Sequence, residues 1–210
     1  MTTPQFSGLV ARATSILLSP NTEWPVIASE PTTARNIYLG YVAPLAAIGA
    51  IAMFIGQVFV GISVPLLGTV RVGIGTGLAT ALLMYAMAFF AVFVLSWIVD
   101  MLAPSFDGQR DPLRALKLVA YSYTPAWIAG VLQLVPVLGI LLLVASLYGL
   151  YLLYLGLPVL MRCPKEKSVV YTIVIVVCAI ILFVLVGVLV SCVSGGSVGV
   201  LGSASGPRFA

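Results

Sequence analysis

Long apolar stretches alternate with short polar ones along most of this chain. Five stretches approach or exceed the length needed to cross a hydrocarbon core about 30 Å thick, which takes about 20 helical residues. They cover residues 37–60, 74–99, 118–135, 137–161 and 169–193. We therefore predict an all-α, polytopic membrane protein, with a bundle of five transmembrane helices forming one domain over residues 37–193.

The third and fourth stretches are nearly fused, with Pro136 and then Gly139 between them. A straight helix over 118–161 would be about 66 Å long at about 1.5 Å per residue, which no bilayer accommodates. A tight hairpin at Pro136 is the expected solution, and a re-entrant loop is the alternative. The fifth stretch is rich in Val and Ile, but it exceeds the about 9–11 residues of a membrane strand, so we predict helix.

Two segments lie outside these stretches. We expect residues 1–36 to form cytoplasmic interfacial helices, because apolar residues recur there at helical spacing opposite Ser7, Arg12 and Thr14, namely Phe6, Leu9, Val10, Ala13 and Leu17. A second short helix follows and ends before Pro31. Residues 194–210 are rich in Gly and Ser and are predicted to be a disordered tail.

The basic residues predict the orientation in the membrane. Eight of them fall on one side of the five-helix topology: Arg12, Arg35, Arg110, Arg114, Lys117, Arg162, Lys165 and Lys167. Only Arg71 and Arg208 fall on the other side. By the positive-inside rule, the N-terminus is cytoplasmic and the tail periplasmic, and a bacterial inner membrane is the expected location.

The amino-acid composition argues against catalysis, metal binding and nucleic-acid binding. The chain is 61% hydrophobic and 8% charged, against about 45–50% and about 25% in soluble domains. It has no His, which removes the commonest general base and metal ligand. The six acids fall in loops or at interfaces and form no catalytic or metal-binding pair. No basic run is interleaved with aromatic residues. We therefore expect no enzyme activity, no cofactor, no metal and no nucleic acid.

Two sets of residues are candidates for function. The first is a cytoplasmic face for a protein or lipid partner, made of Trp24, Glu30, Arg110, Arg114 and Lys117. The second is an intramembrane groove or hinge, made of Pro44, Tyr121, Pro125, Tyr148, Tyr151 and Pro158. Anchoring and ordinary helix packing are the alternatives for both sets. Glycine follows proline by five residues at both Pro44 and Pro125, which hints at a repeated pair of hairpins.

Several segments resemble the Yip family of Ypt/Rab-interacting membrane proteins, in its bacterial branch. They read Leu18-Ser-Pro-Asn-Thr-Glu-Trp24, Ala120-Tyr-Ser-Tyr-Thr-Pro125, Leu147-Tyr-Gly-Leu-Tyr151 and Leu155-Gly156. The resemblance implies a five-helix membrane protein without catalytic residues. Eukaryotic members bind small GTPases and one another. This sequence lacks their Asp-Leu-Tyr-Gly-Pro signature, which argues against small GTPase binding.

Two functions remain open from the sequence. The first is a non-enzymatic scaffold or adaptor that binds membrane proteins or lipids, and the second is a small transporter, channel or lipid-moving protein. The expected partners are membrane lipids. Other membrane proteins and further copies of the chain are partners to test, and the oligomeric state is left open.

Overall fold

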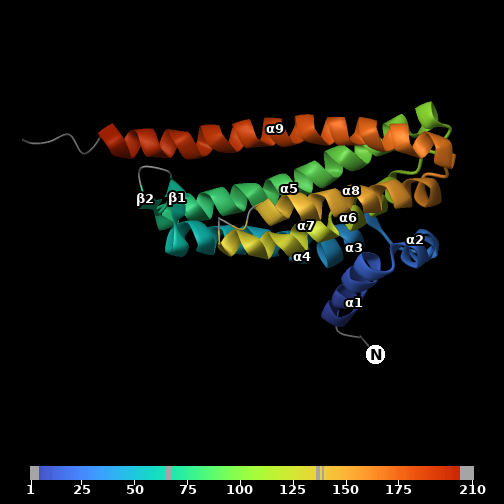
Figure 1. Ribbon diagram of the computed structural model, residues 1–210, viewed down its shortest axis with the longest axis horizontal. Coiled ribbons are helices and arrows are strands. Elements are labelled where there is room, and N and C mark those ends of the chain that lie inside the picture. Colours follow the sequence, from blue (N-terminus) through green and yellow to red (C-terminus); the bar gives the residue numbers. More distant parts are fainter. Residues whose placement is uncertain (1–4, 65–67, 136–137, 139, 204–210) are drawn as a thin grey trace, which may run out of the picture.

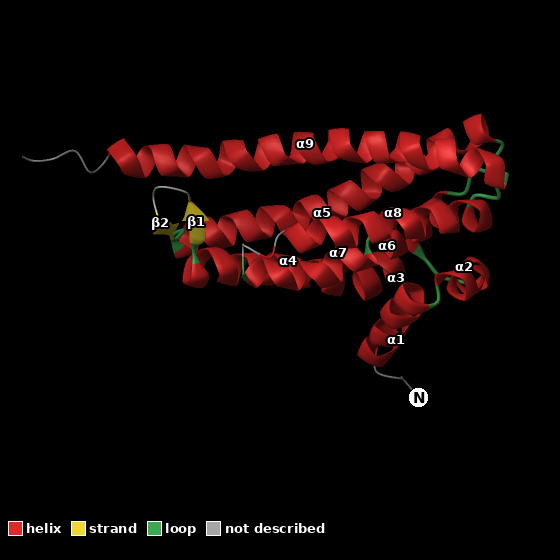
Figure 2. Ribbon diagram, in the orientation of Figure 1, coloured by secondary structure: helices red, strands yellow, loops and turns green. Residues whose placement is uncertain are grey.

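The structure, a computed structural model, describes residues 5–64, 68–135, 138 and 140–203, and most of them are helical (Figures 1 and 2). Two helices precede the bundle: α1 (Gln5–Leu18) and α2 (Pro20–Ser29). The first bundle helix is continuous but irregular. It comprises α3 (Ala34–Ile37), the π-helical turn η1 (Tyr38–Val42), α4 (Ala43–Ile55) and the π-helical turn η2 (Gly56–Val60).

A small hairpin joins the first two bundle helices. Strands β1 (Ile62–Val64) and β2 (Gly68–Val70) pair antiparallel, with Ile62 opposite Val70. The remaining elements are helical: α5 (Ile74–Leu102), the 3₁₀ turn η3 (Ala103–Phe106), α6 (Pro112–Ser122), α7 (Thr124–Ala129), the 3₁₀ turn η4 (Gly130–Leu134), α8 (Ile140–Leu160) and α9 (Lys165–Ser203).

In the part of the chain that the structure describes, four helices are long and apolar enough to cross a membrane. They are Ala34–Val60, Ile74–Phe106, Leu141–Leu160 and Lys165–Val188. The predicted all-α architecture with membrane-spanning helices is therefore confirmed, and four of the described helices, rather than the predicted five, are long and apolar enough to span. The missing one is the stretch 118–135, which is divided among α6, α7 and η4.

Proline explains this division. Pro125 has no N–H to donate, and its ring would collide with the carbonyl of Tyr121 in a continuous helix. The helix stops at Tyr123, and the Thr124 hydroxyl donates to the Tyr121 carbonyl at 2.6 Å in place of the missing bond. The broken segment lies beside α4 and α8, and the chain reverses between Leu134 and α8 (Figure 1). The predicted turn residue, Pro136, lies outside the described residues.

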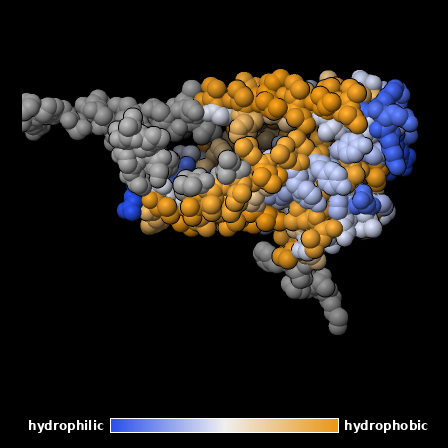
Figure 3. Space-filling view, in the orientation of Figure 1, coloured by the Kyte–Doolittle hydropathy of each residue, from blue (hydrophilic) through white to orange (hydrophobic). Residues whose placement is uncertain are grey.

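The bundle has one strongly charged end. Figure 3 shows apolar residues over the middle of the molecule and hydrophilic ones gathered at the end where α2 lies. This end also holds the start of α9, since Tyr171 packs against Phe106 with 4.5 Å between ring centroids. Figure 1 places the far end of α9 at the opposite end of the bundle. The helix continues to Ser203, into the predicted disordered tail, because no proline interrupts it there.

Candidate functional site

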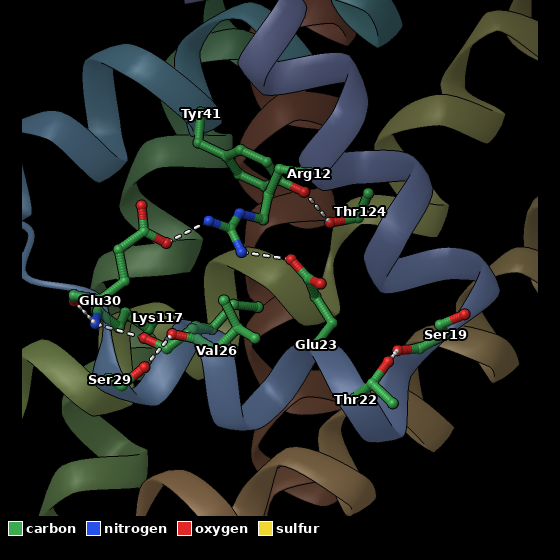
Figure 4. A network of polar contacts seen from close by, with 11 residues as sticks. Arg12, Ser19, Thr22, Glu23, Val26, Ser29, Glu30, Tyr41, Lys117 and Thr124 are labelled. Atoms are coloured by element: carbon green, nitrogen blue, oxygen red, sulfur yellow. Dashed lines mark hydrogen bonds and ion pairs between the residues drawn. The ribbon is translucent and has the colours of Figure 1, made fainter.

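Arg12 organises the two helices that precede the bundle, which we call the platform (α1 and α2, Gln5–Ser29). Its guanidinium donates to the Glu23 carboxylate through Nη1 and to the Glu30 carboxylate through Nη2 (Figure 4). Glu23 lies in the first turn of α2 and Glu30 directly follows that helix. One cation from α1 therefore holds both ends of α2. The Arg12 and Glu23 side chains are only 20% and 16% exposed, which limits screening of the pair by water.

Lys117 fastens the platform to the bundle. This α6 residue is almost fully buried, and its Nζ donates to the carbonyls of Ile27 and Glu30, each at 2.7 Å (Figure 4). The last carbonyls of a helix lack partners within the helix and carry its negative pole, so a cation is well placed there. Burial lowers the pKa of Lys117, and the nearby Glu30 carboxylate opposes that shift.

Trp24 fills a notch in the bundle. Its side chain is fully buried. A Cβ added to Gly156 of α8 would lie 2.9 Å from two ring atoms of Trp24 and 2.5 Å from the Leu118 Cδ1 atom. Only glycine leaves room for the indole ring at this position. Among the described residues the Trp24 Nε1 has no hydrogen-bond acceptor, so apolar packing holds the ring.

A third attachment joins the platform to α8. The Tyr148 hydroxyl donates to the carbonyl of Leu17, near the end of α1, at 2.6 Å. Helix α1 projects from the side of the bundle, with Ala13 and Ile16 buried against it (Figure 1). Val10, a member of the predicted apolar stripe, is 61% exposed. The predicted apolar stripe is thus only partly turned toward the bundle, and Ile16, which the prediction omitted, is fully buried.

The two proline-containing segments meet beneath the platform. The Tyr41 hydroxyl lies 2.7 Å from Thr124 Oγ1 (Figure 4). Thr124 uses its only hydrogen on the Tyr121 carbonyl, so Tyr41 must be the donor in this contact. The Tyr41 and Tyr121 rings also pack together with 4.5 Å between centroids. A polar chain thereby bridges the two irregular helices.

Two glycines bring these segments into backbone contact. A Cβ on Gly130 would lie 2.9 Å from the Gly49 Cα, which is closer than real structures allow. Each glycine follows its proline by five residues. The positions that suggested a repeated hairpin therefore contact each other. Close approach of this kind is the usual role of small residues between membrane helices.

A cavity of about 340 Å³ lies near the charged end, between the first bundle helix, α5 and α6. Its lining includes Asp100, Tyr38, Trp97 and Phe93. A second cavity, of about 220 Å³, is lined by α4 and α5 residues that expose only apolar surface to it. No group of three or more His, Cys, Asp or Glu side chains among the described residues could hold a metal ion.

A family model decides the relationship of this chain to known proteins. The Yip1 domain model matches residues 14–188, which is most of the chain. The chain belongs to the Yip1 domain family. The family resemblance predicted from the sequence is thus confirmed, and the matched residues include α2, Lys117 and Gly156.

Two curated relatives agree with membership of the Yip1 domain family. The chain is 29% identical over 152 residues to the inner membrane protein YohC of Escherichia coli K12, covering 71% of this chain and 78% of that protein. It matches the YohC protein of E. coli O6:H1, strain CFT073, equally well. No solved structure matches the chain significantly.

The five predicted face residues of this Yip1 domain do not all lie on an exposed surface. Trp24 and Lys117 are buried and hold the platform in place. Arg110 is exposed, Arg114 is half-buried and pairs with Asp111 at 3.1 Å, and Glu30 is partly exposed beside Arg12. Only the last three can meet a partner directly.

Neither of the two cavities described above is lined by any of the predicted groove or hinge residues. Tyr121 packs on Tyr41, Tyr148 bonds the platform, and Tyr151 is 46% exposed. The three prolines differ: Pro44 follows the π-helical turn η1, Pro125 breaks its segment, and Pro158 lies within the continuous helix α8.

Four residues that hold this arrangement were absent from both candidate sets: Arg12, Glu23, Tyr41 and Thr124. The sequence does contain a signal for one of these four residues. Arg12 is the only charged residue of α1, and the next charged residue along the chain is Glu23. The Tyr41 and Thr124 contact joins residues 83 apart in sequence, and no local pattern reports such a pair.

Proposed function

We propose that this Yip1 domain protein is a non-enzymatic scaffold of a bacterial inner membrane, whose platform end binds membrane proteins or lipids. The platform end comprises α1, α2, the exposed Arg110 and the half-buried Arg114. The observation that carries the proposal is the Arg12 network, which fixes α2 to α1 while Lys117 fixes α2 to the bundle. A surface held this firmly costs little entropy when it binds.

The distribution of basic residues also favours a binding role for the platform end. The positive-inside rule assigns the platform end to the cytoplasm, which leaves the N-terminus cytoplasmic and the end of α9 periplasmic. Arg110 is exposed and has no ion-pair partner among the described residues. An exposed cation beside a rigid helix is suited to an acidic protein segment or to anionic lipid headgroups.

Charge reversal tests the proposal. The double variant Arg110→Glu, Arg114→Glu should lose the proteins or lipids that co-purify with the wild-type chain in native-lipid particles, because it replaces attraction by repulsion. Mass spectrometry of the retained material gives the measurement. Lys117 is left unchanged, because its burial makes any substitution a test of folding.

The matched control is Arg71→Glu. Arg71 is exposed and lies between β2 and α5, at the opposite end of α5 from the platform. This change should leave the retained material unaltered. Unchanged co-purification by the double variant, with its fold intact, would contradict the proposal.

A transporter is the second candidate function, and one observation favours it. The irregular first bundle helix, which is continuous through Pro44, lies beside the segment that is broken at Pro125, and discontinuous helices commonly form transport sites. Reconstituted vesicles give the test. Movement of a lipid or solute that is present in the wild-type chain and in Gly75→Val, and is lost when Gly130→Val separates the two segments, would favour transport over scaffolding.

A further inference from the structure

Two residues that line the cavity beside Asp100 each carry a polar atom with unmet hydrogen-bonding capacity. The Asp100 Oδ1 and the Tyr38 hydroxyl oxygen are both buried, and neither has a hydrogen-bond partner in the part of the chain that the structure describes. Among the described residues, four of the six acids form ion pairs, namely Glu23, Glu30, Asp107 and Asp111, whereas Asp100 forms none. A buried carboxylate oxygen without a donor is costly, so a ligand that donates hydrogen bonds would be favoured here.

Two exposed aromatic residues, Phe93 and Trp97, belong to the lining of this cavity, together with aliphatic residues of α6. Phe93, Trp97 and Asp100 are four and three residues apart, so they lie along one side of α5. Phe93 is 60% exposed and Trp97 is 58% exposed. Aromatic rings next to a carboxylate attract cations that carry apolar groups. The ligand would therefore combine a cationic donor with an apolar body that reaches into the bilayer.

The position of the cavity near the expected membrane interface favours the headgroup of a lipid as its ligand. Asp100 lies near the end of α5, at the charged end of the bundle where the interface is expected. Arg35 directly follows Ala34, a lining residue, and it is exposed with no ion-pair partner among the described residues. The cavity is thus lined by one anionic side chain, and an exposed cationic residue follows one of its lining residues in the sequence. That arrangement complements a zwitterion.

We propose that this cavity binds a phospholipid whose headgroup carries a primary ammonium, of the phosphatidylethanolamine kind. The ammonium donates to Asp100 and Tyr38, the phosphate lies toward Arg35, and the acyl chains lie along Phe93 and Trp97. None of the residues that line this cavity belongs to α1 or α2, and the proposal does not depend on the proposed scaffold function.

Native mass spectrometry of the purified full-length chain tests the proposal. Phosphatidylethanolamine, phosphatidylcholine and phosphatidylglycerol with identical acyl chains are added to it in turn. The wild-type chain should retain phosphatidylethanolamine in preference to the other two, because only this headgroup offers N–H donors. Asp100→Asn should weaken its binding about tenfold, as expected for the loss of a charge-assisted hydrogen bond.

Two further variants sharpen the result. Glu166→Gln removes an exposed acid at the same end and should leave lipid binding unchanged. Tyr38→Phe keeps the ring that stacks on Phe89 and removes only the unpartnered hydroxyl, so it should weaken binding without disturbing the fold. Equal retention of phosphatidylcholine by the wild-type chain, or unchanged binding in both Asp100→Asn and Tyr38→Phe, would overturn the proposal. Retention of co-purifying proteins by Asp100→Asn is expected, which separates this site from the platform.

Discussion

Helix α9 and the first bundle helix make opposite use of apolar residues. The most apolar stretch of Lys165–Val188 has a mean hydropathy of 3.3, yet only 17% of it is buried. The corresponding stretch of Ala34–Val60 has a mean hydropathy of 2.0, and 39% of it is buried. In a soluble protein the more apolar helix would be the inner one. Here the most apolar helix is the outermost, because lipid rather than protein is its solvent.

The inner helices are held by a different kind of residue. Their contacts depend on glycine, on tyrosine and threonine hydroxyls, and on buried charge, as at Gly49, Tyr41 and Lys117. Lipid already solvates apolar side chains, so burying more of them gains little. Close backbone approach and hydrogen bonds supply the specificity instead. Substitutions in the inner helices should therefore have large effects, and those on α9 should have small ones.

The largest effect is expected for Trp24→Ala. This change empties the notch at Gly156, and loss of a buried large aromatic residue costs about 3–5 kcal/mol. The free energy of unfolding in mixed micelles would fall by that amount, and α2 would become sensitive to protease. A loss below about 1 kcal/mol would mean that the notch does not hold the platform.

A smaller loss is expected for Gly130→Val. The added Cβ would lie 2.9 Å from the Gly49 Cα, so the two segments must separate, and overpacking costs about 1–3 kcal/mol. Gly75→Val is the control, because a Cβ at that exposed position of α5 meets no atom within 4 Å. Equal unfolding free energies for the two variants would contradict the close contact.

A modest effect is expected for Tyr41→Phe. The variant removes the donor to Thr124 but keeps the ring against Tyr121, and hydrogen bonds between membrane helices contribute about 0.6–2 kcal/mol. A double-mutant cycle with Thr124→Val isolates the coupling between the two side chains. Strict additivity of the two changes would show that the bond contributes nothing.

The smallest effect is expected on α9. Phe183 is 74% exposed, so Phe183→Leu should change the free energy of unfolding by less than about 0.5 kcal/mol, as surface substitutions usually do. A loss comparable to that of Gly130→Val would mean that another protein surface covers α9 in the membrane.

The apolar pattern predicts the helices better than it predicts their contacts. Four of the five predicted stretches correspond to long membrane helices, because length and hydropathy are sufficient to identify them. The fifth, 118–135, fails because the consequence of Pro125 depends on what its neighbours can offer the freed Tyr121 carbonyl. That substitute is the Thr124 hydroxyl, held in turn by Tyr41.

The candidate face was harder to predict for a related reason. Trp24 and Lys117 are residue types that commonly lie at the membrane interface, so the sequence placed them on an open surface. Their partners are a glycine and two backbone carbonyls, which carry no distinctive side-chain signal. The family motifs at Trp24 and Leu155-Gly156 did mark the right positions, since the structure brings Trp24 and Gly156 together.

Hydrogen–deuterium exchange of the platform tests the central claim most directly, namely that α1 and α2 are docked rigidly on the bundle. In the wild-type chain the α2 amides should exchange slowly. In Gly156→Val, whose Cβ takes the place of the Trp24 ring, they should exchange at least about tenfold faster while α5 stays protected. Fast exchange of α2 already in the wild-type chain, or no change in Gly156→Val, would contradict the account.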